Sequence, residues 1–210
     1  MAHPVSAPKA SVGAVLLAAG ESTRMGQPKQ LLRWDGMLLL EYQIRQLLAT
    51  DVGQVVVVLG YLYDDLSRIV GRFDSSRLSV VRNEAYKEGK TTSIRAGIAE
   101  LASDATAMVL LAVDQPRPAN LIQRLIDIHR CDTNLITVPS YHGKHGHPPV
   151  FDASLRDELL AITEKGQGIR EVIQRHQQHL RDVPMDEPIV LVNINTPEDY
   201  QRAKALGGEA

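Results

Sequence analysis

Arg24 and Lys29 lie in a loop, "AGESTRMGQPK", that directly follows the small apolar residues of "VGAVLLA". The apolar run predicts a buried strand over residues 12–18, and such strands usually end in a short polar turn rather than in a long charged loop. An arginine guanidinium offers a planar fork of donors for phosphate oxygens, and a lysine ammonium offers a mobile point charge. The loop is therefore a candidate anion-binding site, with solvated loop charges as the alternative.

The start of this loop has a nearly bare backbone. Leu17 is followed by Ala18, Ala19 and Gly20, and residues this small let a flat base or a phosphate approach the main chain closely. The loop matches neither G-x-G-x-x-G nor the P-loop pattern, which disfavours a dehydrogenase or an ordinary ATPase.

A carboxylate, Asp114, stands at the end of a second apolar run, "AMVLLAVD", and Pro116 follows it closely. One carboxylate at the end of a strand can hold Mg²⁺, which takes oxygen ligands and often only one or two of them from protein. The alternative role for Asp114 is a helix N-cap.

The sequence also predicts the strands and helices that must position these residues, because apolar runs alternate along the chain with segments whose apolar residues have helical spacing. Strands are expected over residues 12–18, 54–60, 78–83, 107–114 and 134–140, with an edge or irregular strand over 146–151 and a further strand over 189–194. Helical stripes are expected over residues 40–48, 94–101 and 121–128, with helices over 152–163 and after Gly168, and a last helix capped by Thr196. This order predicts an α/β fold with a single doubly wound, mostly parallel sheet and helices on both faces. In such a sheet, ligands bind beyond the carboxyl ends of the strands, where the first loop and Asp114 are expected.

Composition agrees with one α/β domain, expected over residues 12–207 behind a flexible tail over residues 1–11. The chain has 210 residues, of which 44% are hydrophobic and 4% aromatic. The net charge of −2 argues against a nucleic-acid or membrane-surface partner, so anion binding must be local. The single cysteine excludes an internal disulfide, and no apolar run approaches the length of a membrane span, so a cytoplasmic location is expected.

The segment "LLAAGESTRMGQPKQLL" resembles the signature of the MobA-like nucleotidyltransferases, which attach a nucleotide to the molybdenum cofactor. The resemblance extends over about residues 12–206 and is nearest to the cytidylyltransferase branch. It implies a Rossmann-like fold of the GT-A kind, Mg²⁺ as cofactor, and CTP as substrate. It also implies nucleotide-binding roles for Leu17, Ala18, Ala19, Gly20, Arg24 and Lys29.

The same resemblance assigns metal ligands. Asp114 corresponds to the family's metal-binding aspartate in a short motif that "DQP" matches, and the second ligand, in "VNINTPEDY", aligns with Asn195. Many cytidylyl members carry Asp at that second position, whereas guanylyl members often carry Asn. An amide oxygen coordinates Mg²⁺ without adding charge, so the choice between CTP and GTP stays open. The alternative is that Asn195 only shapes the turn before Thr196.

A third segment, "NEAYKEGKTTSIRAG", reads the base in related enzymes, which assigns Gly89 and Ser93 to nucleotide binding. The "LAAG" sequence favours cytidine by resemblance, because the guanylyl branch more often shows two glycines there. On spacing alone, the hydroxyl residues of this segment are simple helix N-caps. Lys90 departs from the apolar residue frequent at its position, and the sequence gives it no contact.

The acceptor side is assigned by resemblance to Gln115 and Pro116, and to Gly146 and His147 of the "GHP" motif. Three histidines within "YHGKHGHPPVF" also raise the hypothesis of a zinc site. Zinc sites usually add cysteines or an H-x-x-x-H spacing, and neither is present, so a flexible loop facing the acceptor is favoured.

The expected reaction is CMP transfer: a terminal phosphate of a molybdopterin-type acceptor attacks the α-phosphorus of CTP, and pyrophosphate leaves. Arg24, Lys29 and Asp114 are the expected catalytic residues, and no general base is needed because the acceptor phosphate is already ionised. The alternatives are GTP on the same cofactor, transfer to a sugar or polyol phosphate, and, in another class, an accessory protein that delivers the cofactor to a partner molybdenum oxidoreductase.

Overall fold

The structure, a computed structural model, describes residues 11–207. In this part of the chain an eight-stranded sheet has the order β10-β7-β9-β6-β1-β4-β5, and β8 pairs with β7 beside this path. The strands are β1 Val12–Leu17, β4 Gln54–Leu59, β5 Leu78–Arg82, β6 Ala107–Ala112, β7 Ile136–Tyr141, β8 Lys144–His145, β9 Val150–Asp152 and β10 Leu180–Pro184. The predicted flexible tail, residues 1–11, lies outside the described residues except for Ser11.

Most neighbouring strands of the sheet are parallel. β1 runs parallel to β4 and β6, β4 to β5, and β7 to β10. The short β9 is antiparallel to both β6 and β7, and β8 is antiparallel to β7. β1 is buried on both faces because helices cover both sides of the sheet. The predicted mostly parallel, doubly wound α/β fold is therefore confirmed.

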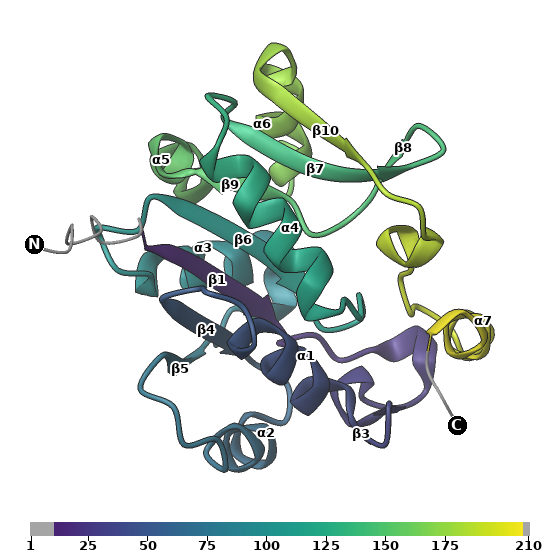
Figure 1. Cartoon of the computed structure of the whole chain (residues 1–210). Coiled ribbons are helices and arrows are strands. Elements are labelled where there is room, and N and C mark those ends of the chain that lie inside the picture. Colours follow the sequence, from purple (N-terminus) through teal and green to yellow (C-terminus); the bar gives the residue numbers. More distant parts are fainter. Residues whose placement is uncertain (1–10, 208–210) are drawn as a thin grey trace, which may run out of the picture.

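Helices form a layer on each face of the sheet, with α1 and α4 in front of it and α3 behind it in Figure 1. One layer is α1 Leu39–Leu48, α2 Tyr63–Val70 and α4 Ala119–Arg130, and the other is α3 Lys90–Glu100, α5 Arg156–Leu160 and α6 Ile169–Arg175. Side chains of β1 alternate between the two cores: Leu16 joins the α1 and α4 side, and Leu17 the α3 side. No helix among residues 11–207 is both long and apolar enough to cross a bilayer.

Short elements shape the carboxyl edge of the sheet. They are the hairpin of β2 Arg33–Trp34 and β3 Met37–Leu38, the last helix α7 Pro197–Gly207, and the 3₁₀ helices η1 Thr23–Met25, η2 Lys29–Leu31, η3 Tyr86–Glu88 and η6 Pro188–Leu191. Two further 3₁₀ helices, η4 Ala153–Leu155 and η5 Gln177–His179, lie at the opposite edge, beside the starts of β6 and β7. The hydroxyl of Tyr200 in α7 donates to the carbonyl oxygen of Arg33. This contact joins the end of the chain to the segment that follows the first loop.

Two predicted strands differ from the structure. Residues 189–194 form no strand, because Pro188 opens η6 and the carbonyl oxygens of Val190 and Val192 accept hydrogen bonds from Arg117 instead of from a neighbouring strand. The apolar side chains of this run are buried by packing into the core. The strand expected over 146–151 is shorter and more central: β9 pairs between β6 and β7, and the prolines lie outside it.

Candidate active site

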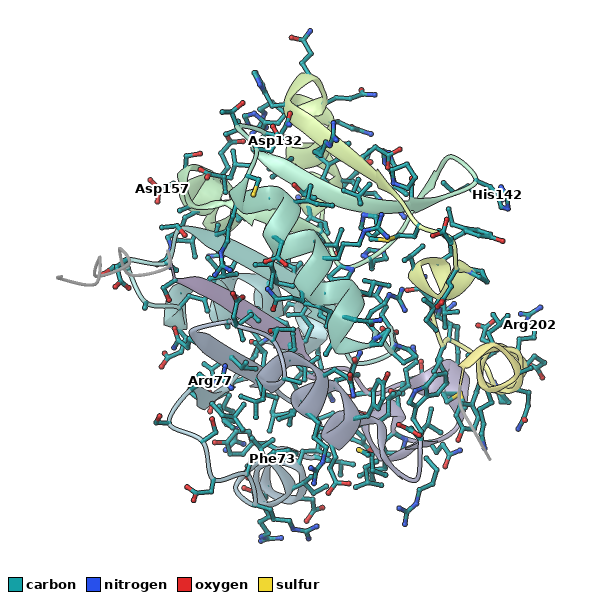
Figure 2. The ribbon with its side chains drawn as sticks, viewed as in Figure 1. Phe73, Arg77, Asp132, His142, Asp157 and Arg202 are labelled. Carbon is teal, nitrogen blue, oxygen red and sulfur yellow. The ribbon has the colours of Figure 1, made fainter. Side chains whose placement is uncertain are left out.

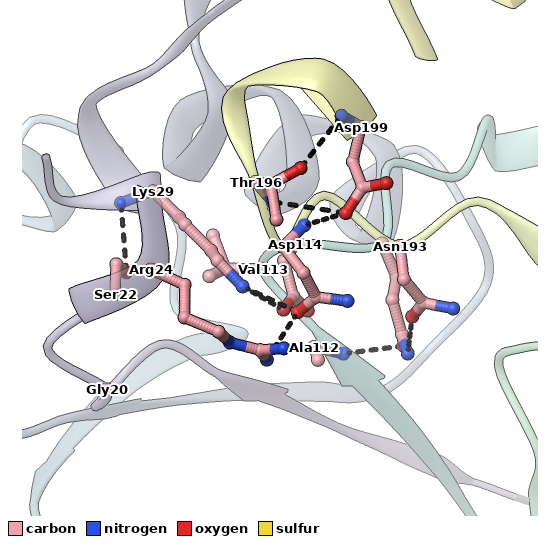
Figure 3. A network of polar contacts seen from close by, with 12 residues as sticks. Gly20, Ser22, Arg24, Lys29, Ala112, Val113, Asp114, Asn193, Thr196 and Asp199 are labelled. Carbon is pink, nitrogen blue, oxygen red and sulfur yellow. Dashed lines mark hydrogen bonds and ion pairs between the residues drawn. The ribbon is translucent and has the colours of Figure 1, made fainter. Parts of the chain in front are cut away.

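The two cations of the first loop meet a carboxylate and an amide from distant parts of the chain (Figure 3). Lys29 Nζ lies 2.7 Å from Asp114 Oδ2 and 3.0 Å from Asn195 Oδ1. Arg24 Nη2 lies 3.4 Å from the same Asn195 oxygen. The side chains of Lys29 and Asp114 are only 11% and 22% exposed, so solvent weakens their attraction less than it would at the surface. Four residues singled out from the sequence therefore converge at one point.

The loop that carries the cations is held by its own polar side chains. Ser22 Oγ accepts a 3.1 Å hydrogen bond from the backbone N–H of Lys29. Gln30 is 1% exposed, and its Nε2 donates to the carbonyl oxygens of Ala18 at 2.7 Å and Gly20 at 3.1 Å. Because these bonds tie both ends of the loop together, Lys29 is directed across the strand ends toward Asp114. Neither Ser22 nor Gln30 was predicted as a site residue.

Asn195 is positioned by the start of α7. Thr196 Oγ1 accepts a 3.2 Å hydrogen bond from the N–H of Asp199, and Asp199 Oδ2 accepts bonds of 3.1 Å from the N–H groups of both Thr196 and Asn195. This reciprocal pair is a capping box, and it confirms the predicted cap at Thr196. The cap fixes the backbone of Asn195, so its amide faces the cations of the first loop.

A first cavity of about 270 Å³ lies beside the bare backbone at the end of β1. Its lining includes Leu17, Ala18, Ala19, Gly20, Lys29, Gly89, Ser93 and Asp114, all predicted as site residues, together with Tyr86 and Lys90. Ser93 Oγ accepts a 2.9 Å hydrogen bond from Asn83 Nδ2, which leaves the hydroxyl hydrogen of Ser93 free to donate. The first cavity thus combines small apolar walls with a few polar groups, as small-molecule sites usually do.

A second cavity of about 610 Å³ adjoins the first and shares Asp114 and Lys90 with it. The second cavity also takes in Gln115, His147 and Asn195 from the predicted set, with Asn193 and the segment 164–173. Gln115 Nε2 donates to Asn193 Oδ1 at 2.6 Å, so these two amides orient each other. Two adjoining cavities with one carboxylate between them suit a reaction between two substrates.

The first turn of α3 is capped by a residue that the sequence did not reveal. Gly89 holds the N-cap position with φ +129, so the hydroxyl residues after it are not the N-caps that spacing alone suggested. Instead, Glu164 Oε1 accepts a 2.6 Å hydrogen bond from the N–H of Thr91. A carboxylate at this position also faces the positive end of the helix dipole.

Two predicted acceptor residues do not line either cavity. Gly146 is buried against η6, and a Cβ built on it would lie 2.4 Å from the carbonyl oxygen of Val190. Pro116 is also buried, and its carbonyl oxygen accepts a 2.8 Å bond from Arg117. Both residues are therefore buried beside the cleft and line neither of its two cavities.

His147 faces the second cavity and is kept neutral there. Burial, together with the positive charges of Lys90, Arg117 and Arg170, lowers the pKa of His147 to about 4, against a smaller opposing effect of Asp114. A neutral imidazole at pH 7 can donate or accept a hydrogen bond but adds no charge to the cavity.

The other two histidines of the same loop lie apart from His147. Figure 2 shows His142 at the tip of the hairpin between β7 and β8, and His145 Nε2 lies 3.8 Å from Asp182 Oδ1. Among residues 11–207, no three histidine, cysteine or acidic side chains gather into a metal site. The zinc hypothesis therefore has no geometric support.

Arg117 is a fully buried cation that sequence reasoning missed. Its guanidinium donates to the carbonyl oxygens of Pro116, His147, Val190 and Val192 at 2.8 to 2.9 Å. Burial lowers its pKa to about 9, so the group stays charged at neutral pH. These bonds tie the segment after Asp114 to the loop of His147 and to the segment before Asn195.

The oxygens of Asp114 and Asn195 fit a divalent cation. Both contact one ammonium, at 2.7 and 3.0 Å, so they flank the same point in the cleft. One carboxylate and one amide oxygen form a hard, incomplete ligand set, which leaves coordination positions for water and phosphate oxygens, as Mg²⁺ prefers. These two residues are the group in the cleft best suited to hold such an ion.

The sequence model of the family described as "MobA-like NTP transferase domain" matches residues 14–181. Residues 11–207 fold as a doubly wound sheet with two adjoining cavities at its carboxyl edge, and the chain belongs to the MobA-like NTP transferase family. The predicted family and enzyme class, a nucleotidyltransferase, are therefore confirmed.

Three relatives match this chain over most of the length of both proteins. The chain is 32% identical to a molybdenum cofactor guanylyltransferase of Xanthomonas euvesicatoria pv. vesicatoria, over 90% of this chain and 92% of the relative. It is 24% identical to the molybdenum cofactor cytidylyltransferase of Escherichia coli, over 92% and 96%. It is also 32% identical to the nicotine blue oxidoreductase of Paenarthrobacter nicotinovorans, over 82% and 85%. One family therefore includes relatives with different nucleotides and one with a redox activity in its name.

Solved structures show the same fold. Rv0371c from Mycobacterium tuberculosis H37Rv has a TM-score of 0.78 at 27% identity, and the match covers 92% of this chain and 97% of that one. A structure of Rv0371c in complex with manganese matches with a TM-score of 0.73 at 25% identity. A metal ion is thus part of a structure with the same arrangement of strands.

Proposed function

We propose that the protein transfers CMP from CTP to the terminal phosphate of a molybdopterin-type acceptor and releases pyrophosphate. The observation that carries this proposal is the contact of the Lys29 ammonium with both Asp114 and Asn195, at the junction of the two cavities. In this proposal, a triphosphate in the first cavity meets an acceptor in the second beside this cation, carboxylate and amide oxygen. The names of the molybdenum cofactor relatives supply the acceptor class.

The side chains of the cleft have distinct tasks in this reaction. Arg24 and Lys29 bind the triphosphate and stabilise the charge that builds up on the departing pyrophosphate. Asp114 and Asn195 would hold Mg²⁺, which supplies polarisation of the phosphoryl oxygens when bound. The acceptor phosphate is ionised near neutral pH, so the protein needs to align the reactants and needs no general base. Gln115 and His147 line the second cavity, where the acceptor would bind. Both side chains are uncharged at neutral pH, so they can hydrogen-bond to the ring system of the acceptor without adding charge.

GTP is a second candidate for the nucleotide. Asn195 stands where guanylyl members often carry the same residue, and the guanylyltransferase relative is 32% identical to this chain against 24% for the cytidylyltransferase. The "LAAG" backbone supports CTP through the family pattern, and the hydroxyl of Ser93 in the same cavity can donate to one acceptor of cytosine, either O2 or N3.

The test is pyrophosphate release with CTP, GTP, ATP and UTP in parallel, each with Mg²⁺ and the molybdopterin acceptor. We expect release with CTP that depends on the acceptor, and a loss of at least about a hundredfold in Asp114→Ala with the fold retained, since one Mg²⁺ ligand and the partner of Lys29 are removed. Release with GTP alone would move the assignment to the guanylyl branch. Acceptor binding without release from any nucleotide would support a cofactor-delivery protein, and no release or binding at all would reject the proposal.

A further inference from the structure

Lys90, the first residue of α3, lies at the junction of the two cavities. Within residues 11–207, no acidic side chain pairs with its ammonium. Lys90 and Asp114 are the two residues common to both linings. Asp114 is paired with Lys29 at 2.7 Å, whereas the exposed side chain of Lys90 forms no hydrogen bond or ion pair within residues 11–207. An unpaired ammonium between two substrate cavities is available to an anion in either of them.

The second cavity carries a second cation of this kind. Arg170 lies in α6 and lines the second cavity but not the first, and its guanidinium has no ion pair within the described part of the chain. Of the two carboxylates of the second cavity, Asp114 is paired with the ammonium of Lys29, whereas Glu164 accepts a neutral N–H from Thr91 and keeps its charge, so Lys90 and Arg170 face one uncompensated carboxylate. The second cavity therefore has surplus positive charge in a protein whose net charge is −2.

The same cavity has an apolar wall. Ile94 of α3 and Ile169 and Ile173 of α6 contribute to its lining. A volume of about 610 Å³ lies within the usual range of small-molecule sites, which is roughly 300–1,000 Å³. The combination of an apolar wall and two unpaired cations suits a ligand that joins a flat ring system to a phosphate.

We infer that Lys90 binds the attacking phosphate of the acceptor where the two cavities meet, and that Arg170 binds the same acceptor farther from the reacting atoms. This inference rests on the proposed nucleotidyl transfer and adds the side chains that select a phosphomonoester on a flat ring system as the second substrate. In the reaction, an oxygen of the acceptor phosphate forms a bond to the α-phosphorus. The bond from the α-phosphorus to the oxygen that bridges to the β-phosphorus breaks, and pyrophosphate leaves with the electron pair.

Two anions must approach each other in this step. The Lys90 ammonium is placed to contact the acceptor phosphate and the α-phosphate at once, which offsets their repulsion and holds them in line. Arg170 reaches only the second cavity, so it contributes to binding and not to the chemical step. The two cations therefore predict different kinetic effects when they are removed.

The experiment compares the parent, Lys90→Met, Lys90→Arg, Arg170→Met and the control Arg95→Met at saturating nucleotide, with the molybdopterin acceptor varied. Arg95 is an exposed cation of the same helix α3 and lines neither cavity. In Lys90→Met we expect the acceptor KM to rise about tenfold and kcat to fall about tenfold, since a charge-assisted contact to the acceptor phosphate is lost from the bound state and a stronger one is lost from the transition state, where the two phosphates are closest. Lys90→Arg should restore much of both losses, whereas Arg170→Met should raise KM with kcat unchanged, and Arg95→Met should match the parent.

Nucleotide affinity, measured by calorimetry for each variant, separates the possible outcomes. An unchanged KM and kcat in Lys90→Met would overturn the inference. So would a weakened nucleotide affinity with an unchanged acceptor KM, because Lys90 would then belong to the nucleotide site. If the parent protein releases no pyrophosphate with any nucleotide, the proposed function itself fails, and that result is distinct from an active parent whose Lys90 variants behave normally.

Discussion

At the scale of single residues, the Lys29 ammonium occupies the place that a divalent cation would take between Asp114 and Asn195. A divalent cation and an ammonium repel each other at such short range, so both cannot share the two oxygens. A triphosphate in the first cavity, which Lys29 lines, would offer this ammonium another anion. We therefore expect nucleotide and metal to bind cooperatively, because the nucleotide draws Lys29 away from the metal ligands.

The variant Lys29→Met tests this competition. Without nucleotide, it should bind Mn²⁺ about three- to tenfold more tightly than the parent, because the competing charge is gone and both oxygens are free. It should also raise the Kd of CTP about tenfold or more, because a charge-assisted contact to the phosphates is lost. Free Mn²⁺ is measured by electron paramagnetic resonance and CTP binding by calorimetry. Lys144→Met, at an exposed residue of β8, is the control; an equal Mn²⁺ affinity in Lys29→Met and the control would show that Lys29 does not compete with the ion.

At the scale of elements, Arg117 connects three segments that carry site residues. Its bonds reach the carbonyl oxygens of the loop of His147 and of the segment before Asn195, while its own backbone follows Asp114 by three positions. The segment over 188–192 is thereby fixed without belonging to the sheet. A strand would satisfy its own carbonyl groups by pairing, but here a buried cation does so.

Arg117→Met should lower the free energy of unfolding by about 3 kcal/mol, because several buried carbonyl groups lose their donor while the apolar volume is kept. Urea denaturation measures the change. Arg124→Met is a matched control: Arg124 is an exposed arginine of α4 that donates to one carbonyl oxygen at 3.4 Å, and its loss should cost less than about 0.5 kcal/mol. Equal stability of the two variants would mean that the buried guanidinium does not hold these segments together.

Local patterns predicted the elements that bury a regular face and missed those that do not. β1, β4 and β6 read as continuous apolar runs, and the stripes of α1, α3 and α4 have helical spacing, so all six were found. β10 has the polar, largely exposed sequence "LRDVP" of an edge strand, which gives no such signal. The run over 189–194 is apolar for a different reason, since it packs into the core from an irregular segment.

For the candidate site, too, the sequence revealed some residues and gave no signal for others. Asp114 follows from a carboxylate at a strand end, and Asn195 required the family resemblance, because an amide before a helix is common in turns. Lys90 was visible only as a departure from the family pattern. Arg170 and Glu164 gave no signal, since their positions depend on how the turn at Gly168, with φ +61, folds back onto α3.

At the scale of the whole molecule, the site draws on groups that only the complete fold brings together. The chain has a net charge of −2, yet Lys29, Lys90 and Arg170 line the two cavities at the carboxyl edge of the sheet, and Arg24 contacts Asn195 there. Two separate cores, one on each face of the sheet, hold the strand ends and helix starts that carry these cations. Because His147 is buried in this cleft with a lowered pKa, the free energy of unfolding should depend on pH, and this dependence can be measured.

The folded protein should lose stability as the pH falls from about 6.5 to about 4, in part through His147. Burial and nearby cations lower the pKa of His147 to about 4 in the folded state, whereas in the unfolded chain it returns to about 6.5. Between these values the unfolded chain binds a proton that the folded chain does not, so protonation favours unfolding; above pH 6.5 this contribution is constant and complete. The loss amounts to about 2 kcal/mol by pH 4.5.

Urea unfolding of the parent and of His147→Gln at pH 7.5 and pH 4.5, without divalent cations, isolates this contribution. Glutamine retains a polar side chain but binds no proton, so the stability of His147→Gln should fall about 2 kcal/mol less than that of the parent over this range. His142→Gln makes the same change at the exposed tip of the β7–β8 hairpin, outside both cavities, and is the control for the loss of an imidazole as such (Figure 2). If His147→Gln and the parent lose equal stability, the imidazole of His147 is protonated as readily in the folded cleft as in the unfolded chain, and the cleft is more open to water than its burial indicates.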